Sequence, residues 1–259
     1  MSVVLIHGNP ETDAIWGPIR TELARDDVIC LSPPGFGTPL PPDFDVTSDG
    51  YLSWLIGELE DLDGPIDLVG HDWGGGHVVR LAMTRPDLIR SWCSDVIGLF
   101  NHEYEWHDAA QSWQGPDGEN AVRSMVELPE SDRAAMFAQL GMGESVAAKV
   151  SPWINADMGH AILGLYRSAS QPVVGDLGEG LSTAAERPGL CIFASEDSYT
   201  GGEVLHRQAA ERAGAQLSVL DGLGHWWMCE DPIRGAELLS SWFDNQDSVS
   251  YTHLRAHET

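Results

Sequence analysis

Short runs of apolar residues alternate along the chain with longer segments whose apolar residues recur at helical spacing. Each run is too short for a helix, and most end at glycine, proline or a polar turn. We therefore interpret the runs as strands that are buried on both faces of a sheet. They lie at residues 3–6, 28–31, 66–69, 91–97, 190–194 and 216–220.

The segments between these runs carry helix signals. Ser48 is a suitable N-cap for an amphipathic helix that continues to Leu62. Asp231 followed by Pro232 predicts the start of the last helix, which we expect to end near Phe243. Because strands and helices alternate, the sequence predicts an α/β protein with a mostly parallel sheet and helices on both faces.

The alternation stops between residues 99 and 180, where the pattern is helical and punctuated by glycine and proline. We expect this segment to form a helical cap, and residues 1–98 and 181–244 to form the core. Residues 245–259 show no apolar period, so we expect a tail without regular structure there.

The chain is strongly acidic. Its formal net charge is -26, and Lys149 is the only lysine. Such a surface repels nucleic acids and anionic membranes, so neither is an expected partner. No run reaches the ~18 apolar residues of a membrane span. Met1 leads directly into the first strand, which predicts a cytoplasmic protein without a signal peptide.

Four scattered cysteines lack metal-site spacing. We expect them to be buried free thiols, as is usual in a reducing compartment. They are Cys30, Cys93, Cys191 and Cys229.

The segment Gly70-His71-Asp72-Trp73-Gly74 carries the most specific chemical signal. It follows a predicted strand and precedes a predicted helix, which is the context of a nucleophile elbow. The central residue of such a turn is presented at the end of the sheet. Asp72 at the start of a helix would be ionised, because the helix dipole favours negative charge there. A carboxylate nucleophile indicates attack on a saturated carbon rather than serine-type acyl transfer.

Residues 3–243 resemble the α/β-hydrolase superfamily, and within it the aspartate-nucleophile branch of epoxide hydrolases and haloalkane dehalogenases. The resemblance lies in the order nucleophile, acid, histidine along the chain. Its motifs are His7-Gly8-Asn9-Pro10, Gly35-Phe36-Gly37, Gly70 to Gly75, Asp197 after a strand, and Gly224-His225 before the last helix.

The resemblance implies a catalytic triad. Asp72 would be the nucleophile, and His225 would deprotonate the water that hydrolyses the resulting ester. Asp197 is our first choice for the acid that orients His225, and Asp95 is the alternative. Glu196 is a third choice.

The resemblance also implies an oxyanion hole formed by the backbone N–H groups of Asn9 and Trp73. In this branch the tetrahedral centre forms on the carboxyl carbon of Asp72 itself. The reaction would have two steps: attack on the substrate carbon, then hydrolysis of the enzyme ester.

Two leaving groups remain open, and the cap decides between them. Epoxide hydrolases supply cap tyrosines, and Tyr166, followed by Arg167, stands at such a place. Tyr104 is the other tyrosine of the insertion, with His107 or His102 as a possible substitute. A halide needs only N–H donors, for which Asn9 and the Trp73 indole are suitable.

We rank epoxide hydrolase first, haloalkane or haloacid dehalogenase second, and a non-catalytic ligand receptor third. We expect a small neutral apolar substrate besides water, no cofactor and no metal. His102 and His107 are five residues apart, which does not stack two ligands on one helix face. A monomer or homodimer is expected.

Two further expectations concern the architecture. The two antiparallel strands that open the sheet in this superfamily lack a counterpart before His7, so one sheet edge should be exposed. The methionine and tryptophan residues of the insertion should line an apolar pocket. These residues are Met125, Met136, Met142, Trp106, Trp113 and Trp153.

Overall fold

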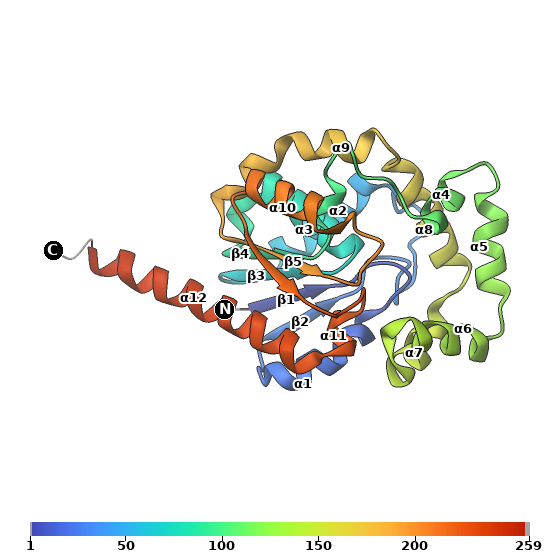
Figure 1. Cartoon of the computed structure of the whole chain (residues 1–259), viewed down its shortest axis with the longest axis horizontal. Coiled ribbons are helices and arrows are strands. Elements are labelled where there is room, and N and C mark those ends of the chain that lie inside the picture. Colours follow the sequence, from blue (N-terminus) through green and yellow to red (C-terminus); the bar gives the residue numbers. More distant parts are fainter. Residues whose placement is uncertain (1, 257–259) are drawn as a thin grey trace.

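The computed structural model describes residues 2–256, with side chains described as far as residue 246. Its centre is a sheet of six parallel strands in the order β2-β1-β3-β4-β5-β6 (Figure 1). The predicted fold class is confirmed. The strands are β1 (Ser2–Ile6), β2 (Val28–Leu31), β3 (Ile66–Gly70), β4 (Ser91–Ser94), β5 (Gly189–Ala194) and β6 (Gln216–Leu220).

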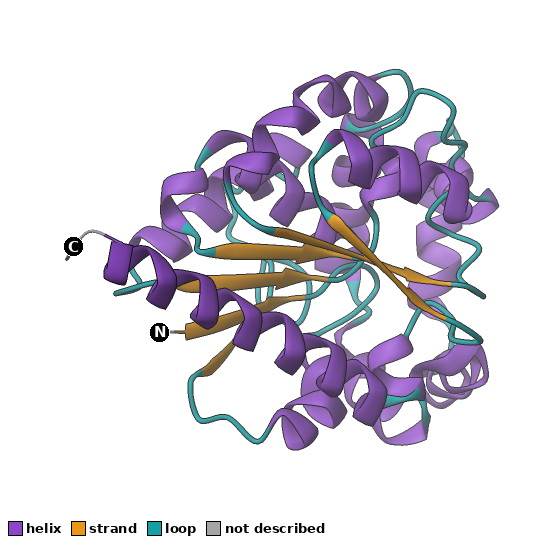
Figure 2. Cartoon of the chain, turned by 60° about the vertical axis from the view of Figure 1, so that its left-hand side comes forward, coloured by secondary structure: helices purple, strands orange, loops and turns teal. Residues whose placement is uncertain are grey.

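Helices cover both faces of the sheet (Figure 2). One face carries α1 (Gly17–Leu23), α11 (Trp227–Glu230) and α12 (Pro232–Ala256), which pack on one another. The other face carries α2 (Ser48–Glu60), α3 (Trp73–Thr84) and α10 (Gly202–Arg212). Short 3-10 turns join them: η1 (Asp13–Trp16), η2 (Pro86–Leu88) and η3 (Ile97–Leu99).

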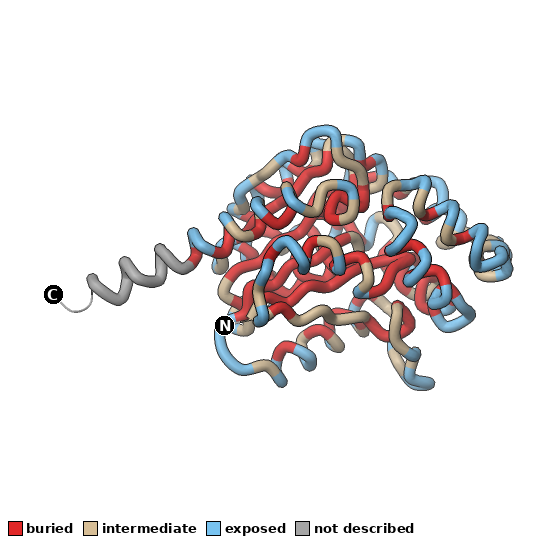
Figure 3. Tube along the Cα trace, turned by 90° about the horizontal axis from the view of Figure 1, so that it is seen from below, coloured by how far each residue is buried: buried red, intermediate tan, exposed pale blue. Residues whose placement is uncertain are grey.

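The strands divide the core into two layers because alternate side chains point to opposite faces. Val3 and Leu5 of β1 belong to the cluster that includes α1 and α12, whereas Val4 and Ile6 belong to the cluster beneath α2 and α3. All four are fully buried, and the sheet forms the buried centre of the molecule in Figure 3.

Most of the helical segment between β4 and β5, residues 108–168, lies beyond the carboxyl ends of the strands (Figure 1). The elements of this segment are α4 (Asp108–Gln114), α5 (Gly118–Glu127), α6 (Glu130–Phe137), the π-turn η4 (Ala138–Met142), α7 (Glu144–Val150), η5 (Ser151–Trp153), α8 (Ala156–Ser168), α9 (Val173–Leu177) and η6 (Gly178–Glu186). Helix α8 packs on α4 and α5, and α6 packs on α7. Because η6 packs on α3, the end of this segment rejoins the core.

The last helix is longer than its sequence pattern predicts. Helix α12 continues to Ala256, so residues 245–256 are helical where we expected a tail without regular structure. Residues 257–259 lie outside the described residues. Extending an existing helix adds a backbone hydrogen bond for each residue without a new nucleus, and this requires no apolar period.

One edge of the sheet is formed by β2. Within the described residues β2 pairs only with β1, and three of its four residues are half-buried. Among the helices of residues 2–256, none has the length and apolar character that a membrane crossing requires.

Candidate active site

The turn between β3 and α3 presents Asp72 in a strained conformation. Asp72 has φ 49° and ψ -128°, a region that residues with a side chain rarely adopt. The turn is tight enough that a Cβ on Gly74 would collide with the carbonyl oxygen of Ile6. The glycines around Asp72 therefore permit the sharp turn that the sequence predicts, and Asp72 lies at the N-terminus of α3.

The Asp72 carboxylate faces the loop after β1. The backbone N–H of Asn9 donates to Asp72 Oδ1 at 2.7 Å. A Cβ on Gly8 would overlap this carboxylate, so glycine is needed for the close approach of the loop. Burial raises the pKa of Asp72 to about 6, against the opposing effects of His225 and of the Asn9 N–H.

His225 follows β6 and lies beside both carboxylates of the predicted triad. Its Nδ1 bonds to Asp197 Oδ2 at 2.8 Å, and its Nε2 is 4.0 Å from Asp72 Oδ2. The side chains of His225 and Asp197 are each 6% exposed. Burial lowers the pKa of His225, but the charge of Asp197 and its hydrogen bond outweigh burial, and the net shift is upward.

The structure places the two alternative acids on different partners. Asp197 follows β5, which neighbours β6, and therefore reaches the His225 loop. Asp95 follows β4 and bonds instead to His71, at 2.5 Å, and to the backbone N–H of Asp72, at 3.1 Å. Glu196 points to solvent.

His71 precedes Asp72 in the chain and lies between two carboxylates. Its Nδ1 bonds to Asp95 and its Nε2 bonds to Glu11 Oε1 at 3.0 Å, and both His71 and Glu11 are fully buried. Burial lowers the pKa of His71, but the charges of Asp95 and Glu11 raise it well above its usual value. With both ring nitrogens facing carboxylates, a protonated His71 can donate to each of them. Its ring centroid is 4.5 Å from that of His225.

Glu11, His71 and Asp95 form a buried cluster, and its two carboxylates also accept backbone N–H groups of the site. Glu11 accepts the Gly8 N–H at 3.0 Å and the Trp226 indole at 2.6 Å. Asp95 accepts the Trp227 indole at 2.7 Å as well as the N–H of Asp72. The cluster thus ties the loop after β1 to the elbow. Sequence reasoning missed it because its members come from segments far apart in the chain.

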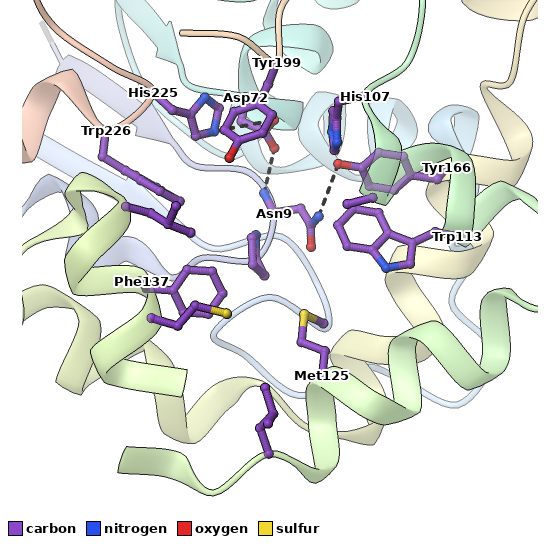
Figure 4. A pocket seen from close by; sticks show the side chains of 15 residues that line it. Asn9, Asp72, His107, Trp113, Met125, Phe137, Tyr166, Tyr199, His225 and Trp226 are labelled. Atoms are coloured by element: carbon purple, nitrogen blue, oxygen red, sulfur yellow. Dashed lines mark hydrogen bonds and ion pairs between the residues drawn. The ribbon is translucent and has the colours of Figure 1, made fainter. Parts of the chain in front are cut away.

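Tyr166 of α8 enters the site from the cap. It is 2% exposed, and its hydroxyl oxygen accepts from Asn9 Nδ2 at 3.2 Å (Figure 4). Its ring meets the Trp73 indole edge to face, with centroids 5.2 Å apart. Burial and the charge of Asp72 raise the pKa of Tyr166 well above its usual value, so the phenol stays protonated.

The structure does not bring Tyr104 to the same cavity. Its hydroxyl donates to the carbonyl of Tyr199 at 2.7 Å. Tyr199, which sequence reasoning missed, lines the cavity instead and packs on His225 with centroids 5.1 Å apart. Its proximity to Asp197 in the sequence was the available signal. His102 is exposed and lies 3.8 Å from Asp176.

His107 lies at the cavity and is the N-cap of α4. Its Nδ1 accepts the Ala110 N–H at 3.3 Å, which leaves the other ring nitrogen to carry the hydrogen. Burial lowers the pKa of His107 to about 4, so the ring is neutral near pH 7. A neutral N–H donor therefore stands near Tyr166 and Tyr199 (Figure 4).

A cavity of about 280 Å³ extends from Asp72 into the cap. Polar groups gather at its inner end, and apolar side chains form the rest (Figure 4). No arginine or lysine lines it among the described residues. The lining residues are Asn9, Pro10, Asp72, His107, Ala109, Trp113, Met125, Leu128, Met136, Phe137, Leu140, Tyr166, Tyr199, His225 and Trp226.

Three of the six cap residues predicted to line an apolar pocket do so: Trp113, Met125 and Met136. Met142 is buried away from the cavity, and Trp153 is on the surface. Trp106 is buried and stacks on Trp73, with centroids 5.7 Å apart.

One buried group of ligand atoms lies close enough together for a metal ion. Glu11, His71 and His225 each place one such atom within 4.8 Å of the others. Both nitrogens of His71 already bond to carboxylates, and His225 Nδ1 bonds to Asp197. His71 and His225 Nδ1 therefore already have carboxylate partners within the protein. A second group, His102, Asp176 and Glu179, is exposed on the surface.

A glycine-flanked elbow after one strand, with a histidine and an acid after later strands, defines the α/β-hydrolase class of site. Residues 3–237 match the model of the alpha/beta hydrolase family, and the chain belongs to this family. It is a hydrolase of the α/β fold.

Individual relatives are distant and differ in activity. The chain is 23% identical to (E)-2-((N-methylformamido)methylene)succinate hydrolase of Acinetobacter baylyi, over 93% of this chain and 90% of that protein. It is 30% identical to a haloalkane dehalogenase of Mesorhizobium japonicum, over 48% and 40%. The structure of the Cif epoxide hydrolase from Acinetobacter nosocomialis is similar with a TM-score of 0.73 and 21% identity, over 93% and 81%.

Proposed function

We propose that the protein hydrolyses epoxides to diols through a covalent ester on Asp72. His225 acts as the base and Asp197 orients it. The observation that carries the choice of epoxides is the contact of Tyr166 with Asn9. Because the phenol oxygen accepts from Asn9 Nδ2, its own proton is free to be donated into the cavity beside Asp72.

The first step forms the ester. An oxygen of the Asp72 carboxylate attacks a ring carbon of the epoxide, and the carbon–oxygen bond of the ring breaks. The departing oxygen takes the proton of Tyr166. Because burial and the charge of Asp72 raise the pKa of Tyr166, the phenol holds its proton until the departing oxygen develops charge and takes it. His107 supplies a second, neutral donor on the same side.

The second step hydrolyses the ester. His225 removes a proton from water, and the hydroxide attacks the carboxyl carbon of Asp72. The Asn9 N–H, 2.7 Å from Asp72 Oδ1, and the N–H of Trp73 stabilise the oxyanion. The ester bond then breaks, and the alkoxide leaves with the proton held by His225. The oxygen of water remains in the Asp72 carboxyl group, and its second proton restores Tyr166.

The lining of the cavity favours a neutral substrate. A buried carboxylate requires a cationic partner, and neither arginine nor lysine is among the fifteen lining residues. The succinate that the Acinetobacter baylyi relative's name describes would lack such a partner here.

Dehalogenation is the second candidate. The Asn9 amide lies at the inner end of the cavity, and the Trp73 indole belongs to the same aromatic cluster as Tyr166. N–H donors of this kind suit a departing halide. The sequence similarity to a haloalkane dehalogenase over half of the chain points the same way.

A paired assay with styrene oxide and 1-bromobutane separates the two candidates. We expect Tyr166→Phe to lower kcat/KM for styrene oxide by about 100-fold, the usual effect of removing one donor to a developing oxyanion. Bromide release should change much less.

Tyr51→Phe is the matched control, because Tyr51 also buries a hydroxyl, which donates to the carbonyl of Pro34 at 2.7 Å, and Tyr51 does not line the cavity. Release of bromide by the wild-type protein without diol formation would reject the proposal in favour of dehalogenation. If the folded protein turns over neither substrate, the third hypothesis, a non-catalytic ligand receptor, would be favoured.

A further inference from the structure

We propose that the cavity selects terminal epoxides that carry one long apolar chain. This inference rests on the proposed function and names its substrate class. It follows from the volumes of the two cavities that Asp72 lines and from the residues at the outer end of the larger one.

The second cavity beside Asp72 is too small for a second substituent. It adjoins Asp72, His107 and Tyr199, and its volume is only about 10 Å³. That is room on the order of one water molecule. The buried side chains of Leu99 and Trp106 close it. An epoxide carbon held at Asp72 therefore carries hydrogen, and no chain, on this side.

The main cavity leads from Asp72 to the surface of the cap. Phe137 and Trp226 near the inner part are less than 5% exposed, whereas Leu128, Met136 and Leu140 are 39%, 37% and 49% exposed. Leu128 directly follows α5, Met136 is near the end of α6, and Leu140 belongs to η4. The opening is therefore framed by apolar side chains, and the end of a long chain can emerge there in contact with them.

The volume sets the length of chain that the cavity buries. A cavity of about 150 Å³ holds benzene, with its six carbons. By the same ratio, 280 Å³ holds about eleven non-hydrogen atoms. 1,2-Epoxydecane has this size, so its chain should fill the cavity, and longer chains should extend through the opening.

Two isomers of equal composition test the single-chain requirement. We expect kcat/KM for 1,2-epoxydecane to exceed that for cis-5,6-epoxydecane by about 100-fold or more, because each buried methylene contributes about fourfold and one butyl arm has no place to lie. Along the 1,2-epoxyalkanes, kcat/KM should rise about fourfold per methylene to decane and then level off. Equal rates for the two decane isomers would overturn the inference.

Variants of the two cavities sharpen the test. Leu99→Ala enlarges the second cavity beside Asp72 and should lower the kcat/KM ratio of the two isomers at least tenfold. Leu59→Ala removes the same side chain from the core beneath α2 and should leave the ratio unchanged. Because a ratio is measured, partial loss of folded protein does not affect it. An unchanged ratio in folded Leu99→Ala would count against the second cavity as the cause.

Binding separates a failure of this inference from a failure of the proposed function. Fluorescence of the cavity tryptophans Trp113 and Trp226 can report binding of 1,2-decanediol and 5,6-decanediol without turnover. If no epoxide reacts, the proposed function fails, and tighter binding of 1,2-decanediol still supports the single-chain cavity. Equal or tighter binding of 5,6-decanediol would reject that cavity, whether or not epoxides react.

Discussion

The acid that orients His225 offers the sharpest test of the site. Asp197 bonds to His225 Nδ1 at 2.8 Å, and both side chains are 6% exposed. When His225 takes a proton from water it becomes an imidazolium, which the charge of Asp197 stabilises. At an effective dielectric constant of about 20, two unit charges 2.8 Å apart attract by about 6 kcal/mol.

Asp197→Asn should therefore slow hydrolysis of the ester by about 10⁴-fold, since each 1.36 kcal/mol is a factor of ten. Formation of the ester does not require His225 as a base and should change far less. The variant is mixed with substrate and the reaction is quenched. The intact mass should then rise by one substrate mass, and digestion should locate the added mass on the peptide that contains Asp72.

Asp95→Asn is the matched control and should act on stability. Asp95 accepts hydrogen bonds from His71, the Trp227 indole and the Asp72 N–H. In Asp95→Asn the amide NH₂ group would face one of these donors, so that hydrogen bond would be lost. Losing one partner of such a buried ion pair costs about 3–5 kcal/mol, which should lower Tm by about 10 °C. Ester accumulation in Asp95→Asn but not in Asp197→Asn would refute the assignment.

Three further outcomes are expected. Asp72→Asn should abolish turnover, because an amide is no nucleophile; full activity measured after purification would contradict the covalent route. His225→Gln should trap the alkyl-enzyme ester, visible as added mass on the Asp72 peptide, and a competent substrate that leaves no adduct would argue against two steps. The value of log kcat/KM should fall with unit slope below about pH 6, since burial raises the pKa of Asp72 to about 6 and only the ionised form attacks; a flat profile down to pH 4 would contradict this.

The buried cluster of Glu11, His71 and Asp95 explains why the elbow and the loop after β1 keep their spacing. Glu11 accepts one backbone N–H from the loop, Asp95 accepts one from the elbow, and His71 bonds to both carboxylates. The cluster also places charges near Asp72 and His225. A positive charge on His71 lowers the pKa of both Asp72 and His225. The negative charge of Glu11 raises the pKa of Asp72.

The local sequence pattern was sufficient to predict the strands and the turn that presents Asp72. Apolar runs and glycine turns have meaning within a few residues, and thus the strands, the elbow at Asp72 and the loop of His225 could be predicted from neighbours in sequence. The length of α12 was not predictable in this way, because helix propagation does not need the apolar period that the prediction used.

The partners of these groups depended on the tertiary structure. Asp95 and Asp197 both follow parallel strands, and only the order of β4, β5 and β6 decides which one reaches His225. Tyr104 and Tyr166 are both cap tyrosines. In the packed structure the Tyr104 hydroxyl bonds to the carbonyl of Tyr199, whereas Tyr166 lines the cavity. The sequence alone determined that a carboxylate stands at the elbow. Because contacts between distant segments arise only when helices and strands pack, the structure alone decided what surrounds it.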